Sequence, residues 1–233
     1  MNKTRWIIFI VVTIGALASL VIFSDNSKIN VEKTEVNIVQ TASKQNGNIA
    51  DHIFGKVGSK VTLIEYGDYQ CPGCGSINPS IVAVAEQYKD QLQFIFRNFP
   101  LTDAHPNAKA AAAAAEAAGL QNKFWEMHNK IYANQSDWEN LSGTERTNIF
   151  VKYATDFDLD SSKFKNDMSS VAVNNKINYD KAIGIKAEVD STPSYYLNGV
   201  KLESSVWGES AKLKEAINAE LNKAGIALPQ SNE

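Results

Sequence analysis

The chain has 233 residues, of which 44% are hydrophobic, and its formal net charge at pH 7 is −3. This length and apolar content suit one globular domain with an insertion, or two small domains. The mild negative charge argues against a nucleic-acid partner. Two cysteines are too few for a disulfide-stapled scaffold or for a four-cysteine zinc site.

The N-terminus predicts export. Lys3 and Arg5 precede an apolar run at 6–23 that carries no charge. Positive residues before such a run hold the N-terminus in the cytoplasm, so the rest of the chain is expected outside it. A small-residue cleavage pattern at 16–18 leaves a cleaved signal open, but the apolar run continues to Phe23 and favours an uncleaved transmembrane helix over residues 1–23.

The next segment, 24–50, is polar and poor in large apolar groups, which predicts a flexible linker. We expect the folded domain to cover residues 51–228. Its first confident strand is 61–66, an apolar, β-branched and aromatic run.

That strand leads into Cys71-Pro72-Gly73-Cys74, which contains the only two cysteines of the chain. Pro72 suits the first position of a helix, which places Cys71 at or beside the N-cap. Unpaired N–H groups and the positive end of the helix dipole favour an anion there, so the Cys71 thiolate is stabilised. Such settings lower a cysteine pKa from roughly 8.5 towards about 3.5–7.5. We expect an exposed, reactive thiol at Cys71, with Cys74 one turn behind it as the resolving thiol.

A helix to about Lys89, kinked at Pro79, is followed by a second strand at 91–96, which makes a strand–helix–strand unit. The C-x-x-C then lies at the carboxyl end of a strand, where open sheets place their sites. From about 107 to 185 only helical patterns occur, which predicts a helical block inserted between two halves of a sheet.

The sheet is expected to resume in the last part of the chain. Thr192-Pro193 leads into a strand that reaches Leu197, and Asn198-Gly199 is a two-residue hairpin turn before the returning strand. Residues 210–224 form an amphipathic closing helix.

Together these motifs resemble the DsbA-like thioredoxin-fold thiol–disulfide oxidoreductases. The resemblance rests on E-Y-G-D-Y-Q-C-P-G-C, then F-R-N-F-P-L, a helical stretch, and T-P-S-Y-Y-L-N-G, in that order. It implies an α/β thioredoxin fold with an inserted helical domain, here preceded by an N-terminal transmembrane helix. It also implies that no metal or organic cofactor is needed.

The resemblance assigns roles to four residues. Cys71 matches the attacking cysteine and Cys74 the resolving one. Pro193, after Thr192, matches the family's cis-proline, which helps to bind an extended substrate peptide. Glu65 matches the buried acid that moves a proton to or from the resolving cysteine.

Other interpretations remain open for these residues. The cysteines are also compatible with a static disulfide or a zinc half-site, although His52, His105 and His128 lack ligand spacing to one another. Pro193 is compatible with a trans bond and Glu65 with a solvent-facing side chain. His128, Trp125 and Trp138 fit core positions better than binding roles.

One position departs from the pattern of the strongest oxidants, which carry a histidine before the second cysteine. Gly73 stands there and supplies no charge and no side-chain hydrogen bond. We therefore predict that the pKa of Cys71 is less depressed, and its disulfide less oxidising, than in those enzymes.

The function expected is the introduction of disulfides into exported proteins by dithiol–disulfide exchange at Cys71 and Cys74. The implied partners are unfolded or reduced exported proteins and a membrane redox protein for recycling, with the domain tethered outside the cytoplasm (periplasm or extracellular face) as a monomer. The alternatives are a membrane-tethered disulfide reductase, an isomerase, and a thiol-based metal carrier. A metal carrier would need a soft ligand such as Met127 or Met168 near the thiols.

Overall fold

The computed structural model describes residues 29–230 of the protein. The chain divides into two compact units, 1–30 and 31–233, and the second holds the sheet and its helices. The transmembrane segment expected at 1–23 lies outside the described residues. Within 29–230, no helix is both long and apolar enough to cross a membrane.

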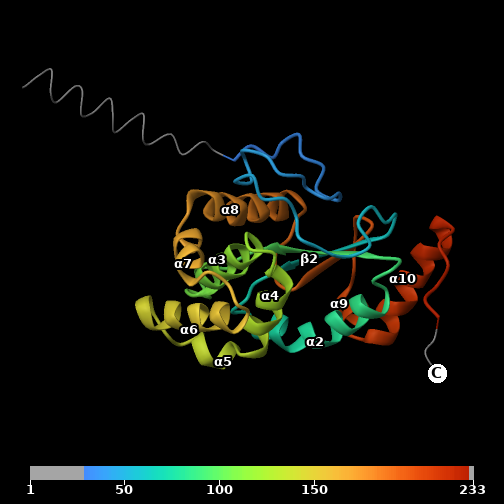
Figure 1. Ribbon diagram of the computed structural model, residues 1–233. Helices are drawn as coiled ribbons and strands as arrows, with labels where there is room; N and C mark the ends of the chain where they lie inside the picture. Colours follow the sequence, from blue (N-terminus) through green and yellow to red (C-terminus); the bar gives the residue numbers. More distant parts are fainter. Residues whose placement is uncertain (1–28, 231–233) are drawn as a thin grey trace, which may run out of the picture. The chain divides into compact units, whose positions relative to one another are not determined.

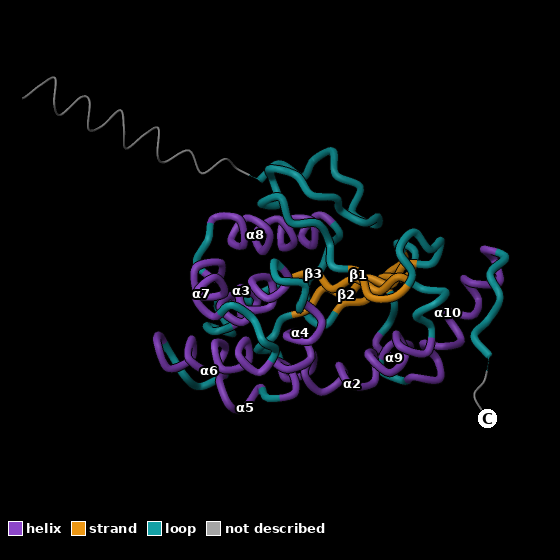
Figure 2. The backbone as a smooth tube through the Cα atoms, in the orientation of Figure 1, coloured by secondary structure: helices purple, strands orange, loops and turns teal. Residues whose placement is uncertain are grey.

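A five-stranded sheet forms the centre of the second unit (Figure 2). Its spatial order is β1-β3-β2-β4-β5, with β2 and β3 parallel and every other pair antiparallel. All residues of the three central strands are buried, which explains their nearly continuous apolar runs. The strands are β1 (Ile53–Gly55), β2 (Thr62–Gly67), β3 (Gln93–Asn98), β4 (Ser194–Leu197) and β5 (Val200–Lys201).

Three helices pack against one face of the sheet: α2 (Pro72–Gln87), α9 (Ser204–Trp207) and α10 (Ser210–Ala224), as Figure 1 shows. The core between them joins Leu63 of β2 to Val84 of α2 and Ile217 of α10. The strand–helix–strand unit β2–α2–β3 is confirmed, because β2 and β3 are parallel neighbours. Pro79 lies inside α2, which continues through it to Gln87.

The expected helical block lies between β3 and β4. It comprises α3 (Ala108–Gly119), α4 (Phe124–Ala133), α5 (Gln135–Trp138), α6 (Gly143–Asp156), α7 (Ser161–Met168) and α8 (Val171–Lys186). The alanine-rich α3 is buried along most of its length, and its small side chains let α4, α7 and α8 pack closely around it. The apolar core of the helical block also contains both cysteines and Phe96 of β3, so the helical block and the sheet share one interior.

The second half of the expected flexible linker is fixed to the domain, which corrects that part of the prediction. Arg97 of β3 is fully buried, and its guanidinium donates to the carbonyl oxygens of Val36 and Ile38. The Gln40 amide N–H donates to Asp51, and Asp51 also forms an ion pair with Arg97 at 2.8 Å. These contacts use main-chain groups of the segment, and they fix it to the buried charges of Asp51 and Arg97 while most of its side chains remain exposed or half-buried.

Candidate active site

Cys71 is the N-cap of α2, as predicted from Pro72. Its φ and ψ of −68° and 122° are extended, and Pro72 begins the helix. The carbonyl of Cys71 accepts the first bond of the helix, from the Gly75 N–H at 3.1 Å. Its side chain therefore lies beside the free N–H groups of the first turn, where a thiolate is stabilised.

The loop before β4 covers the Cys71 thiol. Its Sγ lies 3.4 Å from the carbonyl oxygen of Thr192, and the Thr192–Pro193 peptide bond is cis. A Cβ placed on Gly73 would lie 3.7 Å from both Cys71 Sγ and Pro193 Cδ, so the start of α2 and the loop before β4 converge at this point. Cys71 is only 8% exposed, and the expectation of an openly exposed thiol is wrong because this loop lies over it.

The surroundings lower the pKa of the Cys71 thiol to about 5. The largest cause is the Cys74 thiol, which donates to the Cys71 thiolate, and the N–H groups of Cys74 and Gly73 and the Thr192 hydroxyl act in the same direction. Burial opposes them. The thiolate is therefore the prevailing form of Cys71 at neutral pH.

Cys74 differs from Cys71 in its degree of burial and in the direction of its pKa shift. It is fully buried, and both cysteines are free thiols in this structure. Burial raises the pKa of Cys74 far above its ordinary value, and the charges of Cys71 and Glu65 raise it further. The pair thus combines an ionised sulfur at the rim with a protonated sulfur beneath it.

Glu65 lies on β2 and is 1% exposed, so the structure does not place it in solvent. Burial raises the pKa of its carboxyl group to about 8, although the Tyr195 hydroxyl lowers it in part. A carboxylic acid in this state holds a proton at neutral pH, next to a cysteine whose pKa responds to its charge. Its role in proton transfer stays a prediction.

The loop before Cys71 is fixed by side chains that sequence reasoning missed. The Asp68 carboxylate accepts from the Gln70 N–H and the Leu101 N–H, each at 2.8 Å, and lies 2.8 Å from His105 Nδ1. Gln135 of α5 donates to the Cys71 carbonyl oxygen at 3.0 Å. No local sequence pattern links these residues, because most of these contacts join segments far apart in the chain.

The three histidines lie apart, each with its own partner. His52 is 2.8 Å from Glu116, His105 contacts Asp68, and His128 lies fully buried between Tyr69 and Asn78. The core position expected for His128 is confirmed, and burial lowers its pKa to about 3. Within residues 29–230, no group of three His, Cys, Asp or Glu side chains is arranged to bind a metal ion.

Trp138 is fully buried, as expected, and Trp125 packs partly buried against the sheet. Met127 lies in the same core as the cysteines, and Met168 lies at its edge at the end of α7.

A family model described as thioredoxin matches residues 47–219, which is most of the chain. The chain belongs to the thioredoxin family. This confirms the α/β thioredoxin fold with an inserted helical block, and it explains the pair of thiols at the start of α2.

Solved structures place this thioredoxin-family chain among DsbA-like folds. Oxidised BdbD from Bacillus subtilis has a TM-score of 0.64 and 23% identity, covering 79% of this chain and 98% of that chain. Wolbachia pipientis alpha-DsbA1 has a TM-score of 0.64 and 21% identity, covering 75% and 92%. MdbA, a thiol-disulfide oxidoreductase from Corynebacterium diphtheriae, has a TM-score of 0.59 and 16% identity, covering 80% and 98%. These similarities establish the fold.

The curated relatives that match this chain are named as antiporters. A protein named Na(+)/H(+) antiporter NhaA 1 from Salinispora arenicola is 36% identical over 149 residues, covering 64% of this chain and 22% of that protein. Its namesake from Mycolicibacterium gilvum is 33% identical over 173 residues, covering 72% and 26%. The thioredoxin-family chain thus spans about a quarter of the length of the curated relatives it matches.

Proposed function

We propose that this protein is a protein-disulfide oxidase that donates the Cys71–Cys74 disulfide to reduced exported proteins. The observation that carries the proposal is the lowered pKa of Cys71, about 5, beside the loop of Thr192 and Pro193. Stabilising the thiolate stabilises the reduced enzyme, and this makes the disulfide a stronger oxidant.

The proposed reaction begins when a substrate thiolate attacks Cys71 Sγ of the disulfide. The S–S bond breaks, its electron pair goes to Cys74, and a mixed disulfide joins the substrate to Cys71. A second substrate thiolate then attacks the substrate sulfur of that bond and releases Cys71 as a thiolate. The substrate loses two electrons, the enzyme gains them, and the lowered pKa of Cys71 makes it a good leaving group.

Cys74 leaves the disulfide as a thiolate in a buried site, where its charge is costly. We propose that Glu65 supplies its proton, since the Glu65 carboxyl is buried beside it and holds a proton at neutral pH. In the reverse reaction the Glu65 carboxylate would accept that proton.

Thr192 and Pro193 are proposed to bind the substrate. Their segment precedes β4 and lies against Cys71, so an extended peptide can run beside it through main-chain hydrogen bonds. Recognition of this kind is weakly selective for sequence, which suits an enzyme acting on many unfolded chains.

We further propose that residues 1–23 form an uncleaved anchor, that the domain is a monomer outside the cytoplasm, and that a membrane redox protein re-oxidises it. The charge pattern of Lys3 and Arg5 before the apolar run supports this orientation. The antiporter name carries no proposal of ion transport here, because the chain matches only a quarter of those proteins. Membrane fractionation of cells expressing the full chain, with external labelling of its two thiols, tests the topology.

The second candidate is a disulfide reductase, which uses the same atoms with the opposite electron flow. A redox titration of the full-length protein in glutathione buffers separates the two. A potential of about −120 to −180 mV is expected, and it supports the oxidase. A value near about −270 mV would make the dithiol the working form and reassign the protein as a reductase.

A further inference from the structure

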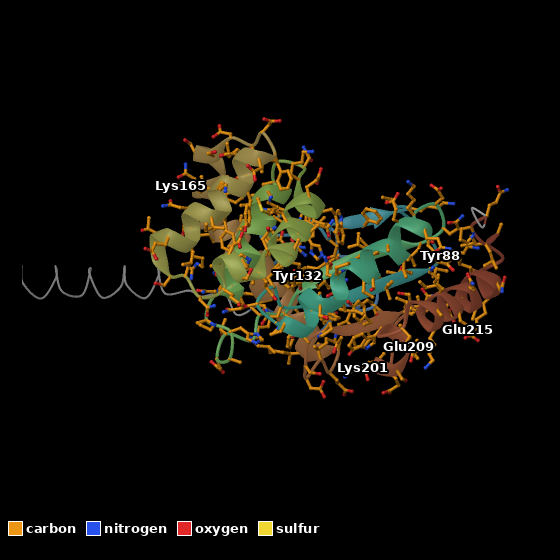
Figure 3. The ribbon with its side chains drawn as sticks, turned by 90° about the horizontal axis from the view of Figure 1, so that it is seen from below. Tyr88, Tyr132, Lys165, Lys201, Glu209 and Glu215 are labelled. Carbon is orange, nitrogen blue, oxygen red and sulfur yellow. The ribbon has the colours of Figure 1, made fainter. Side chains whose placement is uncertain are left out.

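The interior behind the two thiols contains polar groups whose hydrogen-bonding capacity is unused. Both carboxyl oxygens of Glu65 and the hydroxyls of Tyr195 and Tyr132 are buried and have no hydrogen-bond partner within residues 29–230. Buried polar groups are nearly always bonded, and exceptions concentrate where chemistry takes place. Figure 3 labels Tyr132, which lies where the green helices of the insertion meet the teal α2.

Strand register brings Glu65 and Tyr195 together. They are direct cross-strand partners in the antiparallel pair of β2 and β4, so their side chains leave the same face of the sheet. Cβ atoms of such partners lie about 4.5–5.5 Å apart. Tyr195 is two residues beyond Pro193, and the strand that follows the proposed substrate loop therefore also presents this hydroxyl to Glu65.

The Glu65 carboxyl is closely packed by Gly67 and Phe96. A Cβ on Gly67 would lie 2.9 Å from Glu65 Oε1 and 2.3 Å from the Phe96 ring. Glycine at this position leaves room for the carboxyl group, and Phe96, its neighbour on β3, closes the other side. The carboxyl is thus confined to a narrow space between β3 and β4.

The titratable groups that face Glu65 come from three elements. Cys71 and Cys74 belong to the start of α2, Tyr195 to β4 and Tyr132 to α4, and the Tyr132 hydroxyl feels the charges of Cys74 and Glu65. Tyr69, in the loop before α2, also feels Glu65, but its hydroxyl is bonded to His128 Nδ1 at 2.9 Å. Among these groups, Tyr195 is the one whose hydroxyl lowers the carboxyl pKa.

We propose that Tyr195 is a positioning residue: its hydroxyl, unbonded while the Glu65 carboxyl is protonated, donates to the Glu65 carboxylate once that carboxylate forms, and so sets when Glu65 can exchange a proton with Cys74. The inference rests on the proposed thiol–disulfide chemistry. When Cys74 leaves the disulfide, the Glu65 O–H proton moves to Cys74 Sγ and a carboxylate remains. Tyr195 keeps its own proton and stabilises that carboxylate. On re-oxidation, the Cys74 thiol returns the proton to Glu65 before its sulfur attacks.

The test is a single-turnover oxidation of the reduced full-length protein by glutathione disulfide, quenched with acid and resolved by mass. In the first step the Cys71 thiolate attacks glutathione disulfide and releases one glutathione. In the second step the Cys74 thiol loses its proton, attacks Cys71 Sγ and releases the second glutathione. Only the second step needs Glu65 as a proton acceptor, so the first step is an internal control.

Tyr195→Phe removes the donor and keeps the ring. Loss of one charge-assisted hydrogen bond is expected to raise the Glu65 pKa by about one to two units. The pH profile of the second step then moves upward by the same amount, and its rate at pH 7 falls about tenfold. The rate of the first step stays unchanged. Tyr196→Phe is the matched control, because Tyr196 is adjacent on β4, faces the opposite side and donates to the Ala187 carbonyl at 2.7 Å.

A double-mutant cycle separates positioning from general structural effects. In a Glu65→Gln background, Tyr195→Phe should cause no further slowing of the second step, since a glutamine side chain cannot accept the proton. Equal slowing in both backgrounds, or an unshifted pH profile in Tyr195→Phe, would overturn the proposal.

Infrared spectroscopy gives a measurement on the unmutated chain if the Tyr195 variant does not fold. A carboxyl band that titrates near pH 8, gives a hydrogen-bonded carboxylate band on ionisation and disappears in Glu65→Gln supports the proposal, and the band of an unbonded carboxylate refutes it. Both measurements are independent of the direction of electron flow. A reductase-like potential would therefore refute the oxidase and leave the role of Tyr195 standing. An unshifted pH profile in Tyr195→Phe would refute the role of Tyr195 and leave the oxidase standing.

Discussion

The side-chain amide of Gln135 donates to the main-chain carbonyl of Cys71 at 3.0 Å, so the helical insertion contacts the nucleophile's own backbone. The same amide donates to the Tyr69 carbonyl at 2.7 Å. A single side chain of α5 thereby fixes the direction in which the chain enters α2.

This contact predicts that a methyl group added at Gly75 lowers the free energy of unfolding. A Cβ there would lie 2.8 Å from Gln135 Oε1, so Gly75→Ala must displace the amide from the Cys71 carbonyl. We expect a loss of about 1–3 kcal/mol in the free energy of unfolding, although alanine is the better helix former by about 1 kcal/mol. In a Gln135→Ala background the clash is absent, and Gly75→Ala should be neutral or stabilising. Urea unfolding of the four proteins measures this, and equal costs in both backgrounds would contradict it.

Gly73 offers space for the histidine that strong oxidants carry. Its Cβ would stand 3.7 Å from Cys71 Sγ, an ordinary van der Waals distance. Gly73→His should fold, lower the Cys71 pKa below its present value of about 5 by adding a donor beside the thiolate, and make the reduction potential less negative. Gly73→Ala controls for backbone effects and should leave both quantities unchanged. Thiolate absorbance against pH gives the pKa, and a potential shift as large in the alanine variant would refute the electrostatic explanation.

The reduced protein should be more stable than the oxidised protein at neutral pH. The pKa of Cys71 is lowered from an ordinary 9.0 to about 5, so its stabilisation of the reduced fold is greatest above the unfolded pKa and is lost as pH falls through 5. The Glu65 pKa is raised mainly by burial, which we expect in both forms, and the Cys71 charge is the smallest of its causes. After allowance for solvent at the rim, we expect the reduced form to lose about 1–2 kcal/mol relative to the oxidised form between pH 7 and pH 5. Denaturant unfolding of both forms between pH 5 and pH 7 measures the difference between their unfolding free energies. If the stability advantage of the reduced form grew as the pH fell, the prediction would be wrong.

The N-terminal segment predicts a sharp boundary in truncation experiments. Arg97 and Asp51 are buried together, and Arg97 needs the carbonyl groups of Val36 and Ile38. A chain beginning at residue 29 should unfold like the intact domain. A chain beginning at 42 removes two of the acceptors of Arg97 and leaves it Tyr66 and Asp51, and should be less stable by about 3 kcal/mol. Calorimetry of the two truncated proteins tests this, and equal stability would show that residues 29–41 contribute nothing.

Local chemistry explains why much of the site was predictable. Pro72 forces a helix start next to Cys71, and Asn198-Gly199 forces a hairpin turn, because each residue restricts or frees its own backbone. Period and composition placed the paired strands to within two residues and the closing helix 210–224 at its observed bounds.

Long-range contacts account for what was not predictable. Val36 and Ile38 offer only carbonyl groups to Arg97, so nothing in their own sequence distinguishes them from a solvated linker. Gln135 lies in a helix of four residues, too short to give a periodic pattern. The cover over Cys71 comes from Thr192, 121 residues away, and depends on how β4 pairs with β2.

The alternation of side chains along β2 determines whether this strand can accept insertions and deletions. Glu65 faces the thiols, whereas the next residue, Tyr66, contacts Arg97 of the buried ion network at 3.0 Å through its hydroxyl. Two polar interiors with opposite requirements, one for a neutral acid and one for paired charges, are thus separated by the thickness of a single strand. A one-residue insertion or deletion in β2 would exchange their contents and disable both at once, so length changes are tolerated in the loops of this fold and not in this strand.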